Sequence, residues 1–167
     1  MIKIIAIITM LLDHIGQVFF PNIEAFTIIG RLALPLFAWG IATGFKRTSN
    51  FKMYAVRLFV LALISQYPHD LLFNSDYFNV CFTLLAGLLV LKLYETKISY
   101  LLKIPAVIGI LAIAHSMYFE YGIYGIALIT IFYIFEGKQY LIILQAVVTV
   151  FGIRFYNYYP VQFVSIL

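Results

Sequence analysis

Residues 2–20, "IKIIAIITMLLDHIGQVFF", form an apolar run that contains one aspartate and one histidine side by side, Asp13 and His14. A helix needs roughly 20 mostly apolar residues to cross the hydrocarbon core of a bilayer, and this run has about that length. The stretch therefore predicts a membrane-spanning helix that carries an ionisable pair inside the lipid layer.

The rest of the chain has the same character. Of its 167 residues, 64% are hydrophobic and 11% are charged, and the mean hydropathy is +1.02, far from the values of water-soluble domains. Dividing the chain at its polar breaks predicts an all-α, polytopic bundle of about seven spans, followed by a short C-terminal hydrophobic segment. The predicted spans are residues 2–20, 26–44, 53–72, 78–94, 101–118, 121–135 and 140–153.

Lysines and arginines gather in alternate loops of this bundle. One group follows the second span and another follows the fourth: Lys46, Arg47 and Lys52, then Lys92, Lys97 and Lys103. Loops rich in cations face the cytoplasm, so we expect these loops and the N-terminus to lie inside. The net charge of +4 follows from this bias and requires no nucleic-acid partner.

Three ionisable side chains are predicted to lie at one depth. A rise of about 1.5 Å per residue places His14 roughly 18 Å beyond Ile2, in the outer half of the membrane, and Arg31 lies at a similar depth in the second span. Ionisable residues inside a membrane normally face the bundle interior and mark function. The alternative is a purely structural bridge between Asp13 and Arg31. Pro35 cannot donate to the Arg31 carbonyl, which predicts a kink there.

Several motifs in order resemble the TraX family: "LLDHIG" (11–16), "IGRLALPLFAWGIATGFKRT" (29–48), "RLFVLALISQYPHDLLF" (57–73) and "NVCFTLLAGLL" (79–89). TraX-like proteins are bacterial membrane proteins, and the founding member is associated with N-terminal acetylation of conjugative pilin. The family is similar to the acyltransferase-3 and heparan glucosaminide acetyltransferase groups, which use acyl-CoA. The resemblance implies that His14 matches the proposed catalytic histidine of that wider set and that Arg31, Pro35 and Phe37 match its second motif.

The resemblance thus implies an acyl-CoA-dependent N-acetyltransferase of the bacterial inner membrane. It would move an acetyl group from cytoplasmic acetyl-CoA, a co-substrate, to an amine at a peptide or pilin N-terminus. His14 would accept a proton, Asp13 would support the imidazole, and Arg31 would either anchor Asp13 or stabilise an oxyanion. We expect no permanently bound cofactor and no metal. Cys81 is the only cysteine, so a thiolate cluster cannot form.

The phosphates of a CoA donor require cations at the inner mouth of the bundle. Lys46, Arg47, Lys52 and Arg57 meet this need. The alternative is an ordinary positive-inside signal with a snorkelling Arg57.

Polar residues near the outer ends of the third and fourth spans are the predicted acceptor site: Gln66, Asp70, Asn79 and Thr83. Asp70 would bind a cationic amine. The structural alternative is that they cap two helix ends around a break at Pro68.

Residues 1–167 are expected to form a single integral-membrane TraX-like domain. Because TraX-like proteins usually continue through further helices, the ending "YYPVQFVSIL" (158–167) raises the expectation of a truncated C-terminus, and a homodimer could complete the bundle. Two other functions remain open: a small-molecule or proton-coupled transporter, and a catalytically inactive scaffold for pilus or peptide maturation. The inner cations favour the enzyme.

Overall fold

The computed structural model describes residues 2–74 and 76–156, and within them the chain forms eight helices. This confirms the all-α class. The helices are α1 (Ile2–Phe19), α2 (Glu24–Gly30), α3 (Ala33–Arg47), α4 (Phe51–Phe73), α5 (Val80–Glu95), α6 (Tyr100–Ser116), α7 (Gly122–Ile134) and α8 (Leu141–Tyr156). The expected C-terminal hydrophobic segment lies outside the described residues.

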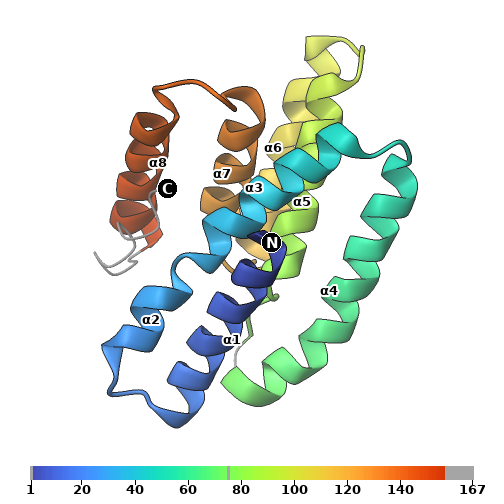
Figure 1. Ribbon diagram of the computed structural model, residues 1–167. Coiled ribbons are helices and arrows are strands. Elements are labelled where there is room, and N and C mark those ends of the chain that lie inside the picture. Colours follow the sequence, from blue (N-terminus) through green and yellow to red (C-terminus); the bar gives the residue numbers. More distant parts are fainter. Residues whose placement is uncertain (1, 75, 157–167) are drawn as a thin grey trace.

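Helices α3, α5 and α7 pack against one another at the centre of the bundle, and the other helices surround them (Figure 1). Their contact surfaces are aliphatic. Leu34 of α3, Leu88 and Leu91 of α5, and Leu128 and Ile129 of α7 are almost completely buried in one cluster. Close packing of these side chains fixes the spacing of the three helices, and with it the positions of the loops that join them.

The predicted second span is two helices. Helix α2 ends at Gly30 and α3 begins at Ala33, so the helical conformation is interrupted at Arg31 and Leu32. The break lies four residues before Pro35, which has no N–H to donate to the Arg31 carbonyl. The kink predicted from the sequence is thus confirmed, and it separates the two helices visible in Figure 1.

Pro68, in contrast, does not break its helix. Helix α4 runs through it to Phe73, so the expected break at Pro68 is wrong. Side chains do bind carbonyls earlier in α4: the Ser65 hydroxyl donates to Leu61 O at 2.6 Å, and Asn79 Nδ2 donates to Ala62 O at 2.9 Å. These bonds fasten the turns before Pro68, whereas the carbonyl that Pro68 leaves without an N–H is that of Ile64.

The outer surface of the bundle is apolar. Large aliphatic side chains on α1, α4, α6 and α8 are exposed, among them Ile4, Ile64, Leu101 and Ile143. Soluble monomers rarely expose large contiguous apolar patches, whereas a lipid-facing surface has this composition. The bundle therefore has the exterior expected of a membrane protein.

Two segments of the described chain are long and apolar enough to cross a membrane, Ile2–Phe19 and Glu24–Arg47. The expected number of about seven spans is not reached by this criterion. The apolar helices α6, α7 and α8 are shorter, and α6 and α7 have 17 and 13 residues. At about 1.5 Å per residue they rise only some 20–26 Å, less than the roughly 30 Å of a bilayer core.

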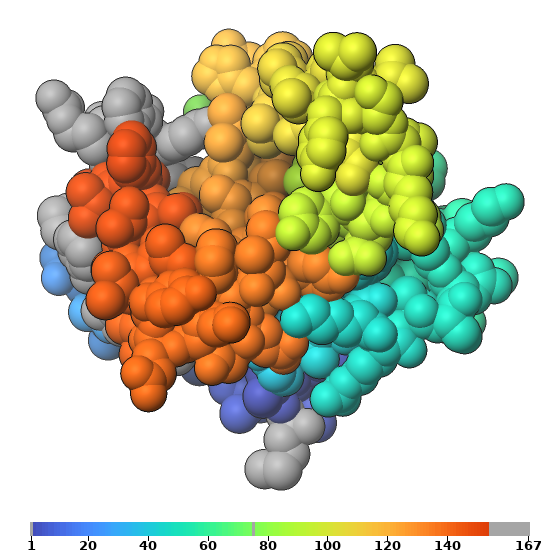
Figure 2. Space-filling view, turned by 90° about the horizontal axis from the view of Figure 1, so that it is seen from above, coloured from blue at the N-terminus to red at the C-terminus, as the bar shows by residue number. Residues whose placement is uncertain are grey.

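Alternate connections lie at the same end of the bundle. The α3–α4, α5–α6 and α7–α8 connections all lie toward the upper side of Figure 1, and Figure 2 looks onto this side. The α1–α2 and α4–α5 connections lie toward the opposite end. The predicted cytoplasmic loops after the second and fourth spans therefore lie on the same side of the bundle.

Gly16 allows α1 and α2 to approach closely, since a Cβ there would lie 2.2 Å from Phe26 Cβ. We expect Gly16→Ala to cost about 1–3 kcal/mol through overpacking and to lower the melting temperature by several degrees. Gly40→Ala is the matched control, because a Cβ at Gly40 would meet nothing within 4 Å. Scanning fluorimetry in detergent measures both variants, and equal melting temperatures would contradict this α1–α2 contact.

Candidate functional site

Asp13, His14 and Arg31 lie in one layer of the bundle. Asp13 and His14 occupy the second half of α1, and Arg31 lies at the α2–α3 break. Gly30 permits this arrangement, because a Cβ there would lie 2.2 Å from Asp13 Oδ1. Asp13, His14, Gly30 and Tyr121 also line one small cavity. The sequence-predicted catalytic residues are therefore brought together.

Asp13 and Arg31 form hydrogen bonds with other residues and not with each other. Asp13 Oδ2 accepts a hydrogen bond of 2.7 Å from Gln17 Nε2, and Arg31 Nη1 donates to the Tyr121 hydroxyl at 3.4 Å. Within the described residues no ion pair of 4 Å or less joins Asp13 to Arg31. A purely structural Asp13–Arg31 bridge is thus not the arrangement that the structure adopts.

Buried polar atoms without a hydrogen-bond partner in the described structure concentrate at this layer. They include Asp13 Oδ1, His14 Nδ1, Arg31 Nε and His69 Nδ1. Buried polar atoms are normally paired, and exceptions call for an explanation such as a catalytic role. Their concentration at one place marks the layer as the candidate site.

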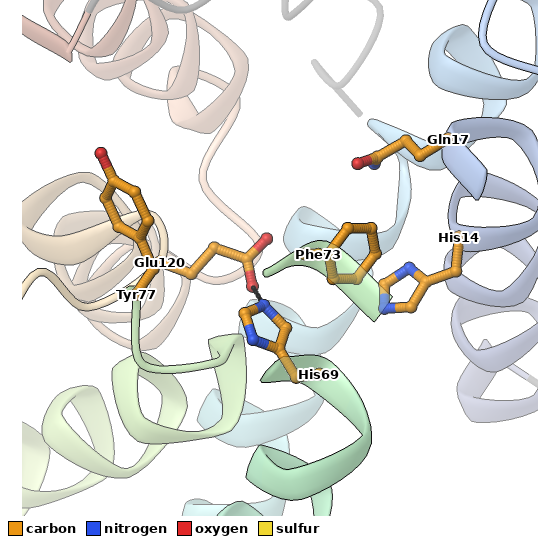
Figure 3. A pocket seen from close by; sticks show the side chains of 6 residues that line it. All are labelled: His14, Gln17, His69, Phe73, Tyr77 and Glu120. Carbon is orange, nitrogen blue, oxygen red and sulfur yellow. Dashed lines mark ion pairs between the residues drawn. The ribbon is translucent and has the colours of Figure 1, made fainter. Parts of the chain in front are cut away.

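Two residues outside the predicted set complete the layer, His69 and Glu120. Both histidine rings pack on Phe73, with ring centroids 5.0 Å away for His14 and 5.2 Å for His69. His69 Nε2 lies 3.8 Å from Glu120 Oε2 (Figure 3). Sequence reasoning missed both because they lie at the ends of apolar segments, where polar residues are ordinary. The one available signal was the position of His69 inside the "SQYPHD" motif.

A left-handed turn presents Glu120. Tyr118, Tyr121 and Gly122 have φ values of 50°, 63° and 37°, a conformation that is costly for tyrosine and often found at functional sites. The turn is bound to the α4–α5 connection, since Glu120 N donates to Phe78 O at 2.8 Å and Phe78 N donates to Tyr118 O at 3.2 Å. The backbone therefore fixes where the Glu120 side chain begins.

The Glu120 carboxylate lies at the start of α5, where Val80 N donates to its Oε2 at 3.1 Å. Burial has the largest effect and raises the pKa of Glu120 to about 7, while the Val80 N–H opposes the shift. The nearby Asp13 carboxylate raises the pKa further and Arg31 lowers it. The group is thus poised to gain or lose a proton near neutral pH.

Two cavities meet at these side chains. One, of about 190 Å³, is lined by His14, Gln17, His69, Phe73, Tyr77 and Glu120 (Figure 3). The other, of about 200 Å³, is largely apolar, with Met10, Leu72 and Val80 in its wall. His14, His69 and Glu120 line both. A reaction at these three groups could therefore draw on two separate binding spaces.

Gln66, Asn79 and Thr83 come together beside this site, where they bind protein groups. Gln66 Oε1 accepts from Asn79 N at 2.9 Å, and Asn79 Oδ1 accepts from Cys81 N at 2.9 Å as the cap of α5. Thr83, which is fully buried, donates to the carbonyl of Glu120. These contacts agree with the alternative that the residues cap helix ends. A contact with the acceptor stays a prediction.

Asp70 is the more accessible member of the predicted acceptor set. It accepts from Gln66 Nε2 at 2.6 Å and lies 3.6 Å from His69 Nδ1, with half of its side chain exposed. Asp70 thus borders the layer through His69 but does not line either cavity described above.

The predicted CoA-binding cations lie at the other end of the bundle. Lys46 pairs with Glu136 at 2.7 Å and lies over the Tyr133 ring, whereas Arg47, Lys52 and Arg57 are exposed. Helix α3 alone, from Ala33 to Arg47, rises roughly 21 Å, and Arg31 lies before its start. The structure thus places Arg47 far from the layer that contains Arg31 and His14.

Comparison with known proteins identifies the family. A family model described as "TraX protein" matches residues 1–166. The chain is 32% identical over 141 residues to "Probable fimbrial assembly protein FimC, serogroup H1" of Dichelobacter nodosus, covering 75% of this chain and 57% of that protein. It is 29% identical over 86 residues to an uncharacterized protein of Rickettsia prowazekii (strain Madrid E), covering 49% and 35%.

The chain thus spans little more than half the length of the first of these relatives and about a third of the second. No solved structure matches it. Because the family model covers nearly every residue, the chain belongs to the TraX family.

Proposed function

We propose that this chain is a multi-pass acyltransferase of the bacterial inner membrane. It transfers an acetyl group from cytoplasmic acetyl-CoA to an amine at the N-terminus of a peptide or pilin-like acceptor. The observation that carries the proposal is the convergence of unpartnered groups of Asp13, His14 and Arg31 beside two cavities that share His14. The name of the Dichelobacter relative refers to fimbrial assembly, in keeping with a pilin-like acceptor.

In the proposed reaction the amine nitrogen attacks the thioester carbonyl. A C–N bond forms, the C–S bond breaks, and the CoA thiolate leaves and takes up a proton. His14 accepts the proton that the nitrogen loses, because an imidazole is the side chain that most often acts as a general base. His14 Nδ1 has no partner in the described structure, so it is available for that proton.

Arg31 is proposed to stabilise the oxyanion that develops on the carbonyl oxygen. Its Nε lacks a partner, its Nη1 is held by the Tyr121 hydroxyl, and it forms no ion pair with Asp13 in the described chain. A fixed donor with a free N–H is what oxyanion stabilisation requires. Neighbouring residues of a helix diverge by about 100°. Asp13 is therefore proposed to stabilise the imidazolium of His14 by its charge rather than by a hydrogen bond.

The donor is proposed to enter from the cationic end. Arg47, Lys52 and Arg57 are exposed there and suit phosphate groups, while Lys46 is already paired with Glu136. The pantetheine arm would then extend along the bundle to His14. Placing the donor at one end and the acceptor at the other separates a cytoplasmic substrate from an external one.

Substitution of His14 tests its role as the proton acceptor. His14→Gln should lower transfer of labelled acetyl from acetyl-CoA to a peptide with a free N-terminus by about 10²–10⁴-fold, the contribution typical of a general base. His115→Gln is the matched control, since His115 is exposed on α6, and it should retain the wild-type rate. The assay uses purified protein in lipid nanodiscs. Absence of both CoA binding and transfer in the wild type would instead favour transport.

The second prediction separates the two roles of Arg31. If Arg31 acts on the oxyanion, Arg31→Gln should lower the rate by about 10²–10³-fold, and the losses of Arg31→Gln and Asp13→Asn should roughly multiply in the double variant. If Arg31 only anchors Asp13, the double variant should be no slower than Asp13→Asn. Single-turnover rates at saturating acetyl-CoA, measured for the wild type, the two single variants and the double variant, distinguish the two roles.

The third prediction concerns the donor. Arg47→Gln and Arg57→Gln should each raise the KM for acetyl-CoA several-fold and leave kcat nearly unchanged, because they remove binding to groups remote from the reacting bond. Lys46→Gln should have a smaller effect, since its ammonium group is engaged with Glu136. Lys138→Gln, another exposed cation of this end, is the control. An equal shift of KM in all four variants would refute a specific phosphate site.

A further inference from the structure

The cavity of about 190 Å³ has the chemistry of a cation-binding site. Its wall contains the Glu120 carboxyl group, the aromatic rings of Phe73 and Tyr77, and two imidazoles. None of its lining residues is a lysine or an arginine. A carboxylate together with aromatic faces is the combination that binds ammonium groups in proteins.

The Glu120 carboxyl group and the rings of His14 and His69 lie around one common space. Figure 3 shows the Glu120 carboxyl group directed toward Phe73 and the two histidines. The Val80 amide holds its Oε2, and His69 faces the same oxygen at 3.8 Å. The His69 side chain is only 10% exposed, and its Nδ1 has no hydrogen-bond partner in the described structure. The pair is therefore held in place by the fold.

We propose that this cavity is the acceptor subsite, in which Glu120 pairs with the ammonium group of the acceptor and His69 takes the proton that the ammonium releases before it attacks. The inference rests on the proposed function and adds the residues that recognise and activate the acceptor. It moves the amine-binding carboxylate from Asp70, the residue suggested by the sequence, to Glu120.

Two protons must leave the nitrogen, and two histidines line the cavity. In the first step an N–H bond of the ammonium breaks, its electron pair stays on nitrogen, and the proton bonds to Nε2 of His69. The imidazolium so formed faces Glu120 Oε2, which stabilises its charge. The neutral amine then attacks the thioester carbonyl, and the second proton passes to His14. Thus each histidine has one proton to accept.

The size of the cavity fits the end of a chain. Its volume of about 190 Å³ equals roughly six water molecules at about 30 Å³ each, which is too small for a folded domain. A neighbouring ammonium favours the ionised carboxylate, so a bound acceptor should lower the pKa of Glu120 from its value of about 7.

Binding tests the proposal without any acyl donor. The probe is the tetrapeptide Ala-Ala-Ala-Ala with a free N-terminus, and its N-acetylated twin is the reference. Calorimetry on the full chain in nanodiscs should show tighter binding of the free amine, and Glu120→Gln should raise its Kd about tenfold or more. Glu24→Gln is the matched control, since Glu24 is exposed in the first turn of α2, and it should leave the Kd unchanged.

Equal binding of the two peptides by the wild type, or an unchanged Kd in Glu120→Gln, would overturn the proposal. A loss of binding confined to Asp70→Asn would also overturn it. If Glu120→Gln does not fold, Tyr77→Leu provides the second variant, because Tyr77 is exposed at the rim of the cavity. It should weaken binding of the free amine and leave the acetylated peptide unaffected, and equal effects on both peptides would count against the site.

His69→Gln tests the proton step. The peptide Kd should stay within about threefold while kcat for transfer falls at least tenfold, and His115→Gln should change neither. A rise in KM with unchanged kcat would overturn this role of His69. Failure of the proposed function has a different outcome: the free amine would still bind through Glu120, but no acetyl group would be transferred by the wild type.

Discussion

The cost of leaving ionisable groups unpaired away from water is the constraint on which this structure depends. Asp13, His14 and Arg31 lie in apolar segments, and exposure of such groups to lipid costs several kcal/mol each. The helices that carry them are therefore turned so that the three residues lie in one layer with Tyr121. Gly30 removes the side chain that would keep α2 away from Asp13. The site is thus a consequence of how the bundle avoids that cost.

The layer is closed by backbone that is not helical. The turn around Glu120 uses left-handed residues and is hydrogen-bonded to the α4–α5 connection through Phe78. Strained backbone of this kind persists only where the surrounding structure holds it, and the Thr83 hydroxyl and the Val80 amide contribute to that. As a result, His69 at the end of α4 and Glu120 before α7 face each other.

The two ends of the bundle differ in chemistry, and the proposed function rests on this difference. The cations at the end of α3 and the start of α4 lie at one end, where Lys46 pairs with Glu136 of the α7–α8 connection. The acid–base layer and its cavities lie toward the other. The chain belongs to the TraX family, and one relative, from Dichelobacter nodosus, is named as a probable fimbrial assembly protein.

Composition and helical period determined the all-α class, the apolar segments and the kink near Arg31, because hydrophobic length and the missing N–H of Pro35 act locally. The expectation that Asp13, His14 and Arg31 share one layer came from counting residues along helices. Only the tertiary structure decided that His69 and Glu120 join them, since that depends on the packing of α4 against α5 and on a turn whose left-handed tyrosines leave no periodic signal in the sequence.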